Sequence, residues 1–203
     1  MNLVFDLGGV VVAYDRAALL AELYADPATQ AAMDVGIEKH LDWMGLDRGT
    51  LGEADAIVAA ARRAGVSATD FARFMVRMAS AWTTIPETVD LLYRLRAKGH
   101  AIFCLSNMHP ASTAFLERAF SFWDVFTGRV ISCQVGLCKP EPAIYAHLLE
   151  RFRLAAPETV FVDDLDVNLA AAAPFGMAPL ASYQTLPLLP LSQIFRLSLR
   201  PRS

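Results

Sequence analysis

The sequence predicts an α/β fold, in which a parallel sheet carries helices on both faces and a small helical insertion interrupts the core. Four short apolar runs have the character of buried parallel strands. Helical patterns alternate with these runs, as is typical of a sheet covered on both sides. Between Asp15 and Trp82 the strand pattern is missing and only helical patterns occur. The expected strands are residues 3–5, 101–105, 130–132 and 160–162.

Three helices of the expected core are marked by their ends. Pro86 opens a segment with apolar residues at helical spacing, and Gly99 closes it just before the second strand. Pro142 suits the first turn of a helix over residues 143–152. A short helix over residues 168–173 is stopped by a proline and a glycine.

The insertion is predicted to contain several short helices. The turns between them are expected at glycines, among them Gly45, Gly49 and Gly65. We therefore predict a core domain of residues 1–14 and 84–203 and a helical domain of residues 15–83. The expected helices of the insertion cover residues 17–24, 28–41, 53–64 and 69–78.

Composition and charge exclude several classes of partner. The 203 residues are 55% hydrophobic and 19% charged, as expected of a folded globular chain. Eighteen Lys and Arg against 21 Asp and Glu give a net charge of −3, so we expect neither a nucleic acid nor a membrane as partner. Three cysteines without metal-ligand or disulfide spacing, and no export signal at the N-terminus, favour a cytoplasmic location. We expect a monomer or a homodimer.

Polar side chains follow the ends of three expected strands. Because ligands bind at the carboxyl ends of the strands in open α/β sheets, we expect these side chains to meet in one crevice. A lysine that precedes a helix start joins the set. The residues are Asp6, Ser106, Asn107, Asp163, Asp164 and Lys139.

Three carboxylates in one crevice need positive charge nearby. Two like charges 4 Å apart cost about 4 kcal/mol at an effective dielectric of 20. Lys139 balances one of them, and Mg²⁺ suits the others because it prefers carboxylate oxygens together with substrate phosphate. Hydroxyl and amide donors beside such a charge cluster indicate phosphoryl chemistry.

The order of these motifs resembles that of the haloacid dehalogenase-like (HAD) hydrolase superfamily. The four motifs are residues 5–10 (FDLGGV), 105–107 (LSN), 139–140 (KP) and 162–164 (VDD) with Asn168. The resemblance covers almost the whole chain and implies a Rossmann-like core. It also implies that the insertion is a cap domain of the C1 type, with residues 47–51 at a turn between cap helices.

The resemblance implies a role for each motif residue. Asp6 would attack phosphorus and form an aspartyl-phosphate, which water then hydrolyses. Ser106 and Asn107 would hold the phosphoryl oxygens, and Lys139 would neutralise Asp6 and the phosphate. The implied activity is Mg²⁺-dependent hydrolysis of a small phosphorylated metabolite.

The same resemblance implies the ligands of the metal. Asp164 would be the main Mg²⁺ carboxylate, with Asp6, the neighbouring Asp163 and the Gly8 carbonyl completing the set. Asn168 would orient Asp164 from one helical turn away.

One position departs from the commonest phosphatase pattern, Asp-x-Asp, whose second Asp protonates the leaving alcohol. Gly8 stands there. The Asp-Leu-Gly form resembles a branch that includes bacterial α-glucose-1-phosphate phosphatases, which suggests a sugar phosphate with a good leaving group. His109, expected at the surface, or a residue of the cap would otherwise have to replace the acid.

Two alternatives stay open. The 2-haloacid dehalogenases of the same superfamily also use an Asp nucleophile without the second Asp, and they need no metal. The pair Asp163 and Asp164 favours a metal site and hence a phosphatase. A noncatalytic phosphate-binding module is the other alternative, against which the joint presence of Asp6, Lys139 and Asp164 argues.

Substrate selection is expected to depend on the cap, because the strand-end groups recognise only phosphate and metal. Trp43, Met44, Asp47 and Arg48 cluster near a turn that would face the crevice, with Trp82 where the chain returns to the core.

Overall fold

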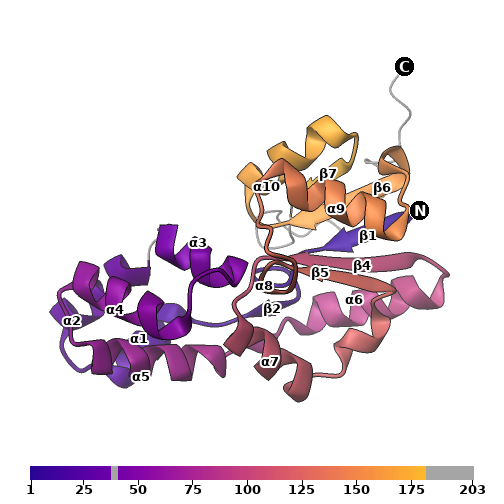
Figure 1. Cartoon of the computed structure of the whole chain (residues 1–203). Helices are drawn as coiled ribbons and strands as arrows, with labels where there is room; N and C mark the ends of the chain where they lie inside the picture. The colour runs from indigo at the N-terminus through magenta and orange to yellow at the C-terminus, as the bar shows by residue number, and fades with distance from the viewer. Residues whose placement is uncertain (38–40, 182–203) are drawn as a thin grey trace.

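The computed structural model describes residues 1–37 and 41–181. A five-stranded parallel sheet in the order β5-β4-β1-β6-β7 forms the core (Figure 1). In the central strand, Leu3 pairs with Ile102 on one side and Val160 on the other. The α/β class is therefore confirmed. The strands are β1 (Asn2–Phe5), β4 (Ala101–Ser106), β5 (Gly128–Ile131), β6 (Thr159–Asp163) and β7 (Ala178–Ala181).

Two details of the sheet differ from the expectation. Edge strand β7 was not predicted, because it is short and contains Pro179, which an edge position tolerates. Ser132, expected to end β5, instead begins the one-turn helix α8 (Ser132–Val135).

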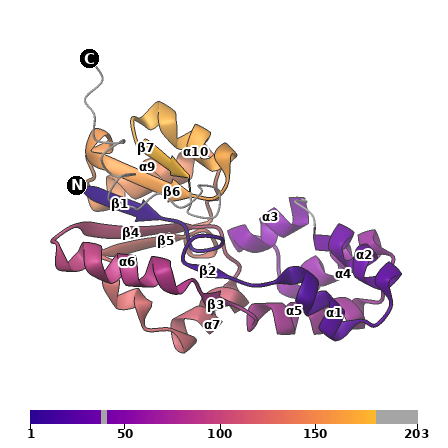
Figure 2. The same ribbon diagram turned by 180° about the vertical axis from the view of Figure 1, so that it is seen from behind.

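Helices cover both faces of the sheet, as Figure 2 shows from behind. Leu3 and Phe5 pack on one face with Leu92, whereas Val4 points to the other face and packs with Tyr145. The first face is covered by α6 (Pro86–Ala97), α7 (Pro110–Ala119) and the 3-10 turn η1 (Phe122–Val125). The second is covered by α9 (Pro142–Phe152), α10 (Asp166–Ala172) and the 3-10 turns η2 (Ala156–Glu158) and η3 (Ala173–Phe175).

The insertion is helical and has a hydrophobic cluster of its own. Phe71, Phe74 and Met78 of one helix form its centre together with Met33 and Leu46. The apolar stripe of that helix keeps the helices of the insertion together. The helices are α1 (Arg16–Leu23), α2 (Pro27–Ile37), α3 (Leu41–Arg48), α4 (Glu53–Ala64) and α5 (Ala68–Ala79).

Helix α3 is the element of the insertion that the sequence analysis missed. Gly45 was expected to mark a turn, but it lies inside α3. A Cβ added at Gly45 would lie 3.1 Å from the Cβ of Leu51, so the glycine permits the loop after α3 to fold back closely. The predicted turn begins only at Gly49, so Asp47 and Arg48 occupy the last turn of α3.

A two-stranded antiparallel ribbon lies where the chain leaves and re-enters the core. It pairs β2 (Val12–Ala13) with β3 (Thr83–Thr84). The predicted domain boundaries at residues 15 and 83 stay a prediction. Residues 182–203, at the end of the predicted core range, and residues 38–40 lie outside the described residues.

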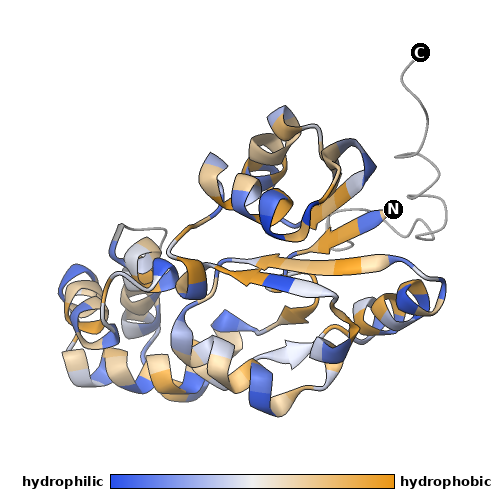
Figure 3. Ribbon diagram, turned by 45° about the vertical axis from the view of Figure 1, so that its right-hand side comes forward, coloured by the Kyte–Doolittle hydropathy of each residue, from blue (hydrophilic) through white to orange (hydrophobic). Residues whose placement is uncertain are grey.

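The distribution of hydropathy follows this architecture. In Figure 3 the central strands are mainly hydrophobic, whereas the helices alternate between hydrophobic and hydrophilic residues. Among the described residues, no helix combines the length and the apolar character that crossing a bilayer requires.

Candidate active site

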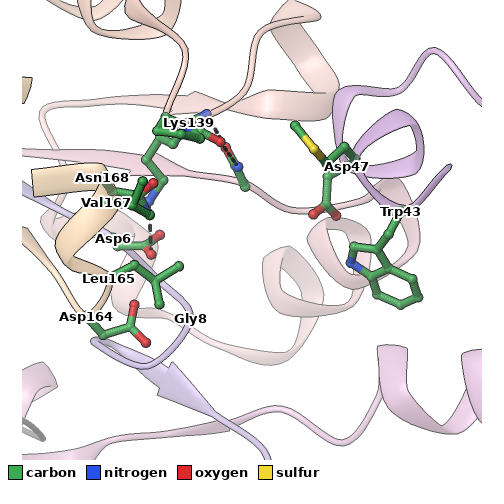
Figure 4. A pocket seen from close by; sticks show the side chains of 12 residues that line it. Asp6, Gly8, Trp43, Asp47, Lys139, Asp164, Leu165, Val167 and Asn168 are labelled. Atoms are coloured by element: carbon green, nitrogen blue, oxygen red, sulfur yellow. Dashed lines mark hydrogen bonds and ion pairs between the residues drawn. The ribbon is translucent and has the colours of Figure 1, made fainter. Parts of the chain in front are cut away.

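A cavity of about 340 Å³ lies between the carboxyl ends of β1, β4 and β6 on one side and residues of helix α3 on the other (Figure 4). One wall belongs to the core and the other to α3; we call them the core wall and the cap wall. The core wall consists of Asp6, Gly8, Asn107, Lys139, Pro140, Asp164, Leu165, Val167 and Asn168. The cap wall consists of Trp43, Met44 and Asp47.

Lys139 joins two carboxylates at the centre of the core wall. Its Nζ lies 2.9 Å from Oδ2 of Asp6 and 2.6 Å from Oδ2 of Asp163. All three residues are buried. Asp6 follows β1, Asp163 ends β6, and Lys139 precedes α9, so the fold brings together three residues that are distant in the chain.

Burial and the ion pairs set the charges of this group. Burial raises the pKa of Asp6 to about 6, against the opposing effect of Lys139. Burial alone would lower the pKa of Lys139, but Asp6 and Asp163 together raise it above its usual value. Lys139 is therefore a permanent cation next to Asp6 at neutral pH.

Asn107 holds the main chain of Lys139. Its Oδ1 accepts a hydrogen bond of 2.8 Å from the Lys139 N–H, and its Nδ2 donates one of 2.8 Å to the Lys139 carbonyl. One amide hydrogen of Asn107 is left for a ligand in the cavity. Ser106, directly before it, is buried; its hydroxyl makes no hydrogen bond of regular geometry among the described residues but lies close enough to Asp6 to lower the pKa of that carboxyl.

The partner of Asn168 differs from the expectation. Its Nδ2 donates to Oδ1 of Asp163 at 2.9 Å, and the Leu165 N–H donates to the same oxygen at 2.9 Å. Asn168 thus orients Asp163. Asp163 is fully buried, and both of its oxygens have protein partners. The reason is position: Asp163 is still inside β6 and points below the surface of the cavity.

Asp6, Asp163 and Asp164 each offer a carboxylate oxygen within 4.8 Å of the others. A hard divalent cation suits such a set of carboxylate oxygens. Gly9 makes room for Asp164: its φ is +71°, and a Cβ there would lie 2.2 Å from Oδ2 of Asp164. Gly8, two residues after Asp6 in the chain, also lines the cavity.

His109 is buried, which contradicts its expected surface position. It precedes α7, and its Nε2 lies 2.8 Å from the hydroxyl of Ser112. Burial lowers the pKa of His109 to about 4, so the imidazole is neutral at pH 7. His109 is not among the residues that line the cavity.

The cap wall is fixed to the core by contacts at the end of α3. Arg48 pairs with Glu141 through both ends of its guanidinium group, with Nη1 2.8 Å from Oε2. The hydroxyl of Ser132 donates to the carbonyl of Asp47 at 2.5 Å. No role was predicted for Ser132, although a polar residue at the end of an apolar strand is a signal for one.

All the residues predicted for the site therefore gather at one place. Six of them line the cavity, while Ser106 and Asp163 lie directly behind it. The six are Asp6, Gly8, Asn107, Lys139, Asp164 and Asn168.

Comparison with known proteins agrees with this geometry. The profile of the haloacid dehalogenase-like hydrolases matches residues 1–176. The chain belongs to this family and is a HAD-like hydrolase.

Two curated relatives are matched over most of their length. The chain is 26% identical to the sesquiterpene phosphatase of Aspergillus oryzae, over 87% of each chain. It is 28% identical to the D-ribitol-5-phosphate phosphatase of Bacteroides thetaiotaomicron, over 83% of this chain and 84% of the relative.

Solved structures share the fold. A HAD-family enzyme of Bacteroides thetaiotaomicron in complex with magnesium and inorganic phosphate has a TM-score of 0.74 at 23% identity, covering 96% of this chain and 98% of that chain. The L-2-haloacid dehalogenase RSc1362 has a TM-score of 0.72 at 22% identity, covering 93% and 88%. An enzyme with bound magnesium and phosphate and a haloacid dehalogenase thus share this fold.

Proposed function

We propose that the protein is a Mg²⁺-dependent phosphomonoester hydrolase that forms an aspartyl-phosphate on Asp6. The observation that carries this proposal is the buried pair of Asp6 and Lys139, with the carboxylate of Asp164 within 4.8 Å. Lys139 keeps Asp6 ionised and lowers the repulsion that an incoming phosphate dianion meets. The resemblance to two phosphatases at 26% and 28% identity supports the same class.

The other core residues at or directly behind the cavity fit defined parts of this reaction. The hydroxyl of Ser106, which lies beside Asp6, and the remaining amide hydrogen of Asn107 are donors for phosphoryl oxygens. Asp163 and Asn168 keep Lys139 in place. In this arrangement Asn107 both positions Lys139 and meets the substrate.

Mg²⁺ would be held by Asp6, Asp164 and the Gly8 carbonyl. We assign Asp163 to positioning Lys139, because its two oxygens already have protein partners. Bound there, the cation would neutralise charge on the phosphoryl group and bring it to Asp6.

The substrate is a small organic monophosphate. The cavity of about 340 Å³ admits a phosphate with a compact organic part. Beyond the phosphate region the lining includes the apolar side chains of Trp43 and Met44 from the cap and of Leu165 and Val167 from the core. This lining favours an alcohol with a largely apolar skeleton over the sugar that the sequence suggested.

The experiment that tests the function is hydrolysis of p-nitrophenyl phosphate and of a panel of alkyl, prenyl and sugar monophosphates. We expect turnover that requires Mg²⁺, stops with a chelator, and falls by about 10⁴-fold or more in Asp6→Asn. Asp15→Asn, outside the cavity, is the matched control and keeps full activity.

Results that contradict the proposal identify its alternatives. Halide release from 2-haloacids without metal would indicate a dehalogenase. Phosphate binding without any turnover would indicate a binding module.

A further inference from the structure

The position of Gly8 leaves the site without the acid that commonly protonates the leaving alcohol. A Cβ added at Gly8 would lie 3.7 Å from the Trp82 ring, so Trp82 fills the space beside it. Trp82 is itself fixed, because its Nε1 donates to the hydroxyl of Ser112 at 2.9 Å. The proton must therefore come from another part of the cavity.

Each ionisable residue of the core wall already has another role in the proposed reaction. Asp6 is the proposed nucleophile, Asp164 is a proposed metal ligand, and Lys139 bridges two carboxylates. His109 lies outside the lining and is neutral. On the cap wall, among the described residues that line the cavity, Asp47 is the ionisable side chain.

We propose that Asp47 is the general acid and base of the reaction, supplied by the cap in place of the residue absent at Gly8; this inference rests on the proposed phosphatase function. Figure 4 shows the Asp47 carboxylate pointing into the cavity from the side opposite Asp6. Phosphoryl transfer requires this arrangement, because attacking and leaving oxygens lie in line on opposite sides of phosphorus. A donor for the leaving oxygen must therefore face the nucleophile across the substrate.

Contacts on both sides of Asp47 hold it in place. The Ser132 hydroxyl binds its carbonyl, and the next residue, Arg48, pairs with Glu141 of the core. Gly49 follows at a φ of +77°, where a Cβ would lie 2.8 Å from the carbonyl oxygen of Cys133. The end of α3 thus packs directly on α8, so the carboxyl group has a fixed position relative to the core.

The environment of Asp47 also suits a proton donor at neutral pH. Burial, and then the negative charge of Asp6, raise the pKa of Asp47 to about 7, although the His109 N–H and Lys139 oppose this. Arg48 is turned toward Glu141 and does not pair with Asp47. The negative charge of Asp47 in turn raises the pKa of three further groups: Tyr14, Cys133 and Cys138.

The proposed cycle returns Asp47 to its starting state. In the first step an Asp6 oxygen bonds to phosphorus, the bond from phosphorus to the alcohol oxygen breaks, and that oxygen takes the proton of Asp47. In the second step Asp47 removes a proton from water, whose oxygen bonds to phosphorus. The bond from phosphorus to Asp6 then breaks, its electron pair returns to the carboxylate, and phosphate leaves.

The test compares two leaving groups in Asp47→Asn with Mg²⁺ present. An alkyl monophosphate needs a proton on its leaving oxygen, so we expect its kcat to fall by about 10²- to 10⁴-fold. p-Nitrophenolate leaves without a proton. With p-nitrophenyl phosphate we therefore expect a rapid burst of one p-nitrophenol per site, then slow turnover, because the phosphoenzyme lacks its base. Asp55→Asn, an exposed cap carboxylate in the first turn of α4, is the control and behaves as wild type.

A second measurement needs no variant. In the wild type, kcat for the alkyl phosphate should fall as the pH rises above about 7, since Asp47 loses its proton. The burst rate with p-nitrophenyl phosphate should not fall there.

Each unfavourable result has a distinct meaning. Equal losses on both substrates without a burst, or no loss at all, would overturn the role of Asp47 while leaving the phosphatase intact. A wild type that hydrolyses neither substrate with Mg²⁺ would overturn the proposed function itself.

Discussion

The two walls of the cavity are built in different ways. The core wall takes its polar residues from strand ends and holds them in a buried network in which Asn107, Lys139, Asp163 and Asn168 are joined by hydrogen bonds and ion pairs. The cap wall comes from one face of α3, where Trp43 and Asp47 are one helical turn apart. It contacts the core along its length, with the Trp43 ring beside His109 and the pair of Arg48 and Glu141 at its end.

This difference separates two tasks of the proposed reaction. The core wall offers the fixed charges that bind and transfer a phosphoryl group, whatever alcohol carries it. The cap wall contacts the alcohol part of the substrate. It therefore selects the shape of that alcohol and, in the proposed reaction, supplies the proton to its leaving oxygen. Changes to the core wall should affect all substrates equally, whereas changes to the cap wall should depend on the leaving group.

The largest effect is expected for Lys139→Met. This change leaves Asp6 and Asp163 as buried carboxylates without their cation, so we expect activity to fall by about 10³-fold or more on every substrate. We also expect a loss of about 3–5 kcal/mol in the free energy of unfolding, measured by denaturant titration. Lys98→Met, at the exposed end of α6, is the control and should change neither. An active and stable Lys139→Met enzyme would refute this account of the core wall.

A smaller effect is expected on the pH dependence of stability. The pKa of Asp47 is about 7 in the folded protein, against an ordinary value of 3.8, so the folded state holds this proton over a range in which the unfolded state has lost it. Stability contributed by Asp47 is therefore lost as the pH rises from about 4 to about 7. In the wild type this group should lower the free energy of unfolding by roughly 3 kcal/mol between pH 5 and pH 8, and Asp47→Asn should remove that loss while it lowers activity.

The comparison is between unfolding curves at pH 5 and pH 8. The exposed control Asp55→Asn should leave the difference between the two pH values unchanged. If Asp47→Asn also leaves that difference unchanged, the pKa of Asp47 is not raised in the folded protein.

The smallest effect is expected where the cap wall meets the core. Arg48→Met frees the end of α3 and should lower kcat/KM for an alkyl phosphate by about 10-fold. The unfolding free energy should change by less than about 1 kcal/mol, since this ion pair is partly exposed. Glu141→Gln should have the same effect, and the double variant should be no worse than either. If the double variant instead loses as much free energy of activation as the two single variants together, the two residues act separately.

The sequence predicted the core wall well because strand ends follow simple rules. Asp6, Ser106 and Asp163 follow apolar runs directly, so their convergence required only the parallel order of the strands. The partners within the network were less predictable. Asn168 was assigned to Asp164 from helical spacing, but Asp163 is the residue that lies beneath it.

The cap wall could be predicted only in part. Asp47 was recognised as a residue near the crevice, but helix α3 was missed because Gly45 looked like a turn. The burial of His109 depends on the packing of α7 against the cap, which no local pattern indicates. The raised pKa of Asp47 likewise depends on desolvation by distant segments of the chain.

The measurement that tests the central claim most directly is trapping of the phosphoenzyme. The wild type is mixed with Mg²⁺ and p-nitrophenyl phosphate, quenched in acid during turnover, digested and examined by mass spectrometry. We predict a phosphoryl group on the peptide that contains Asp6 and none on the same peptide of Asp6→Asn. Phosphate release without a phosphoryl group on Asp6, in wild type and in Asp47→Asn alike, would contradict the account.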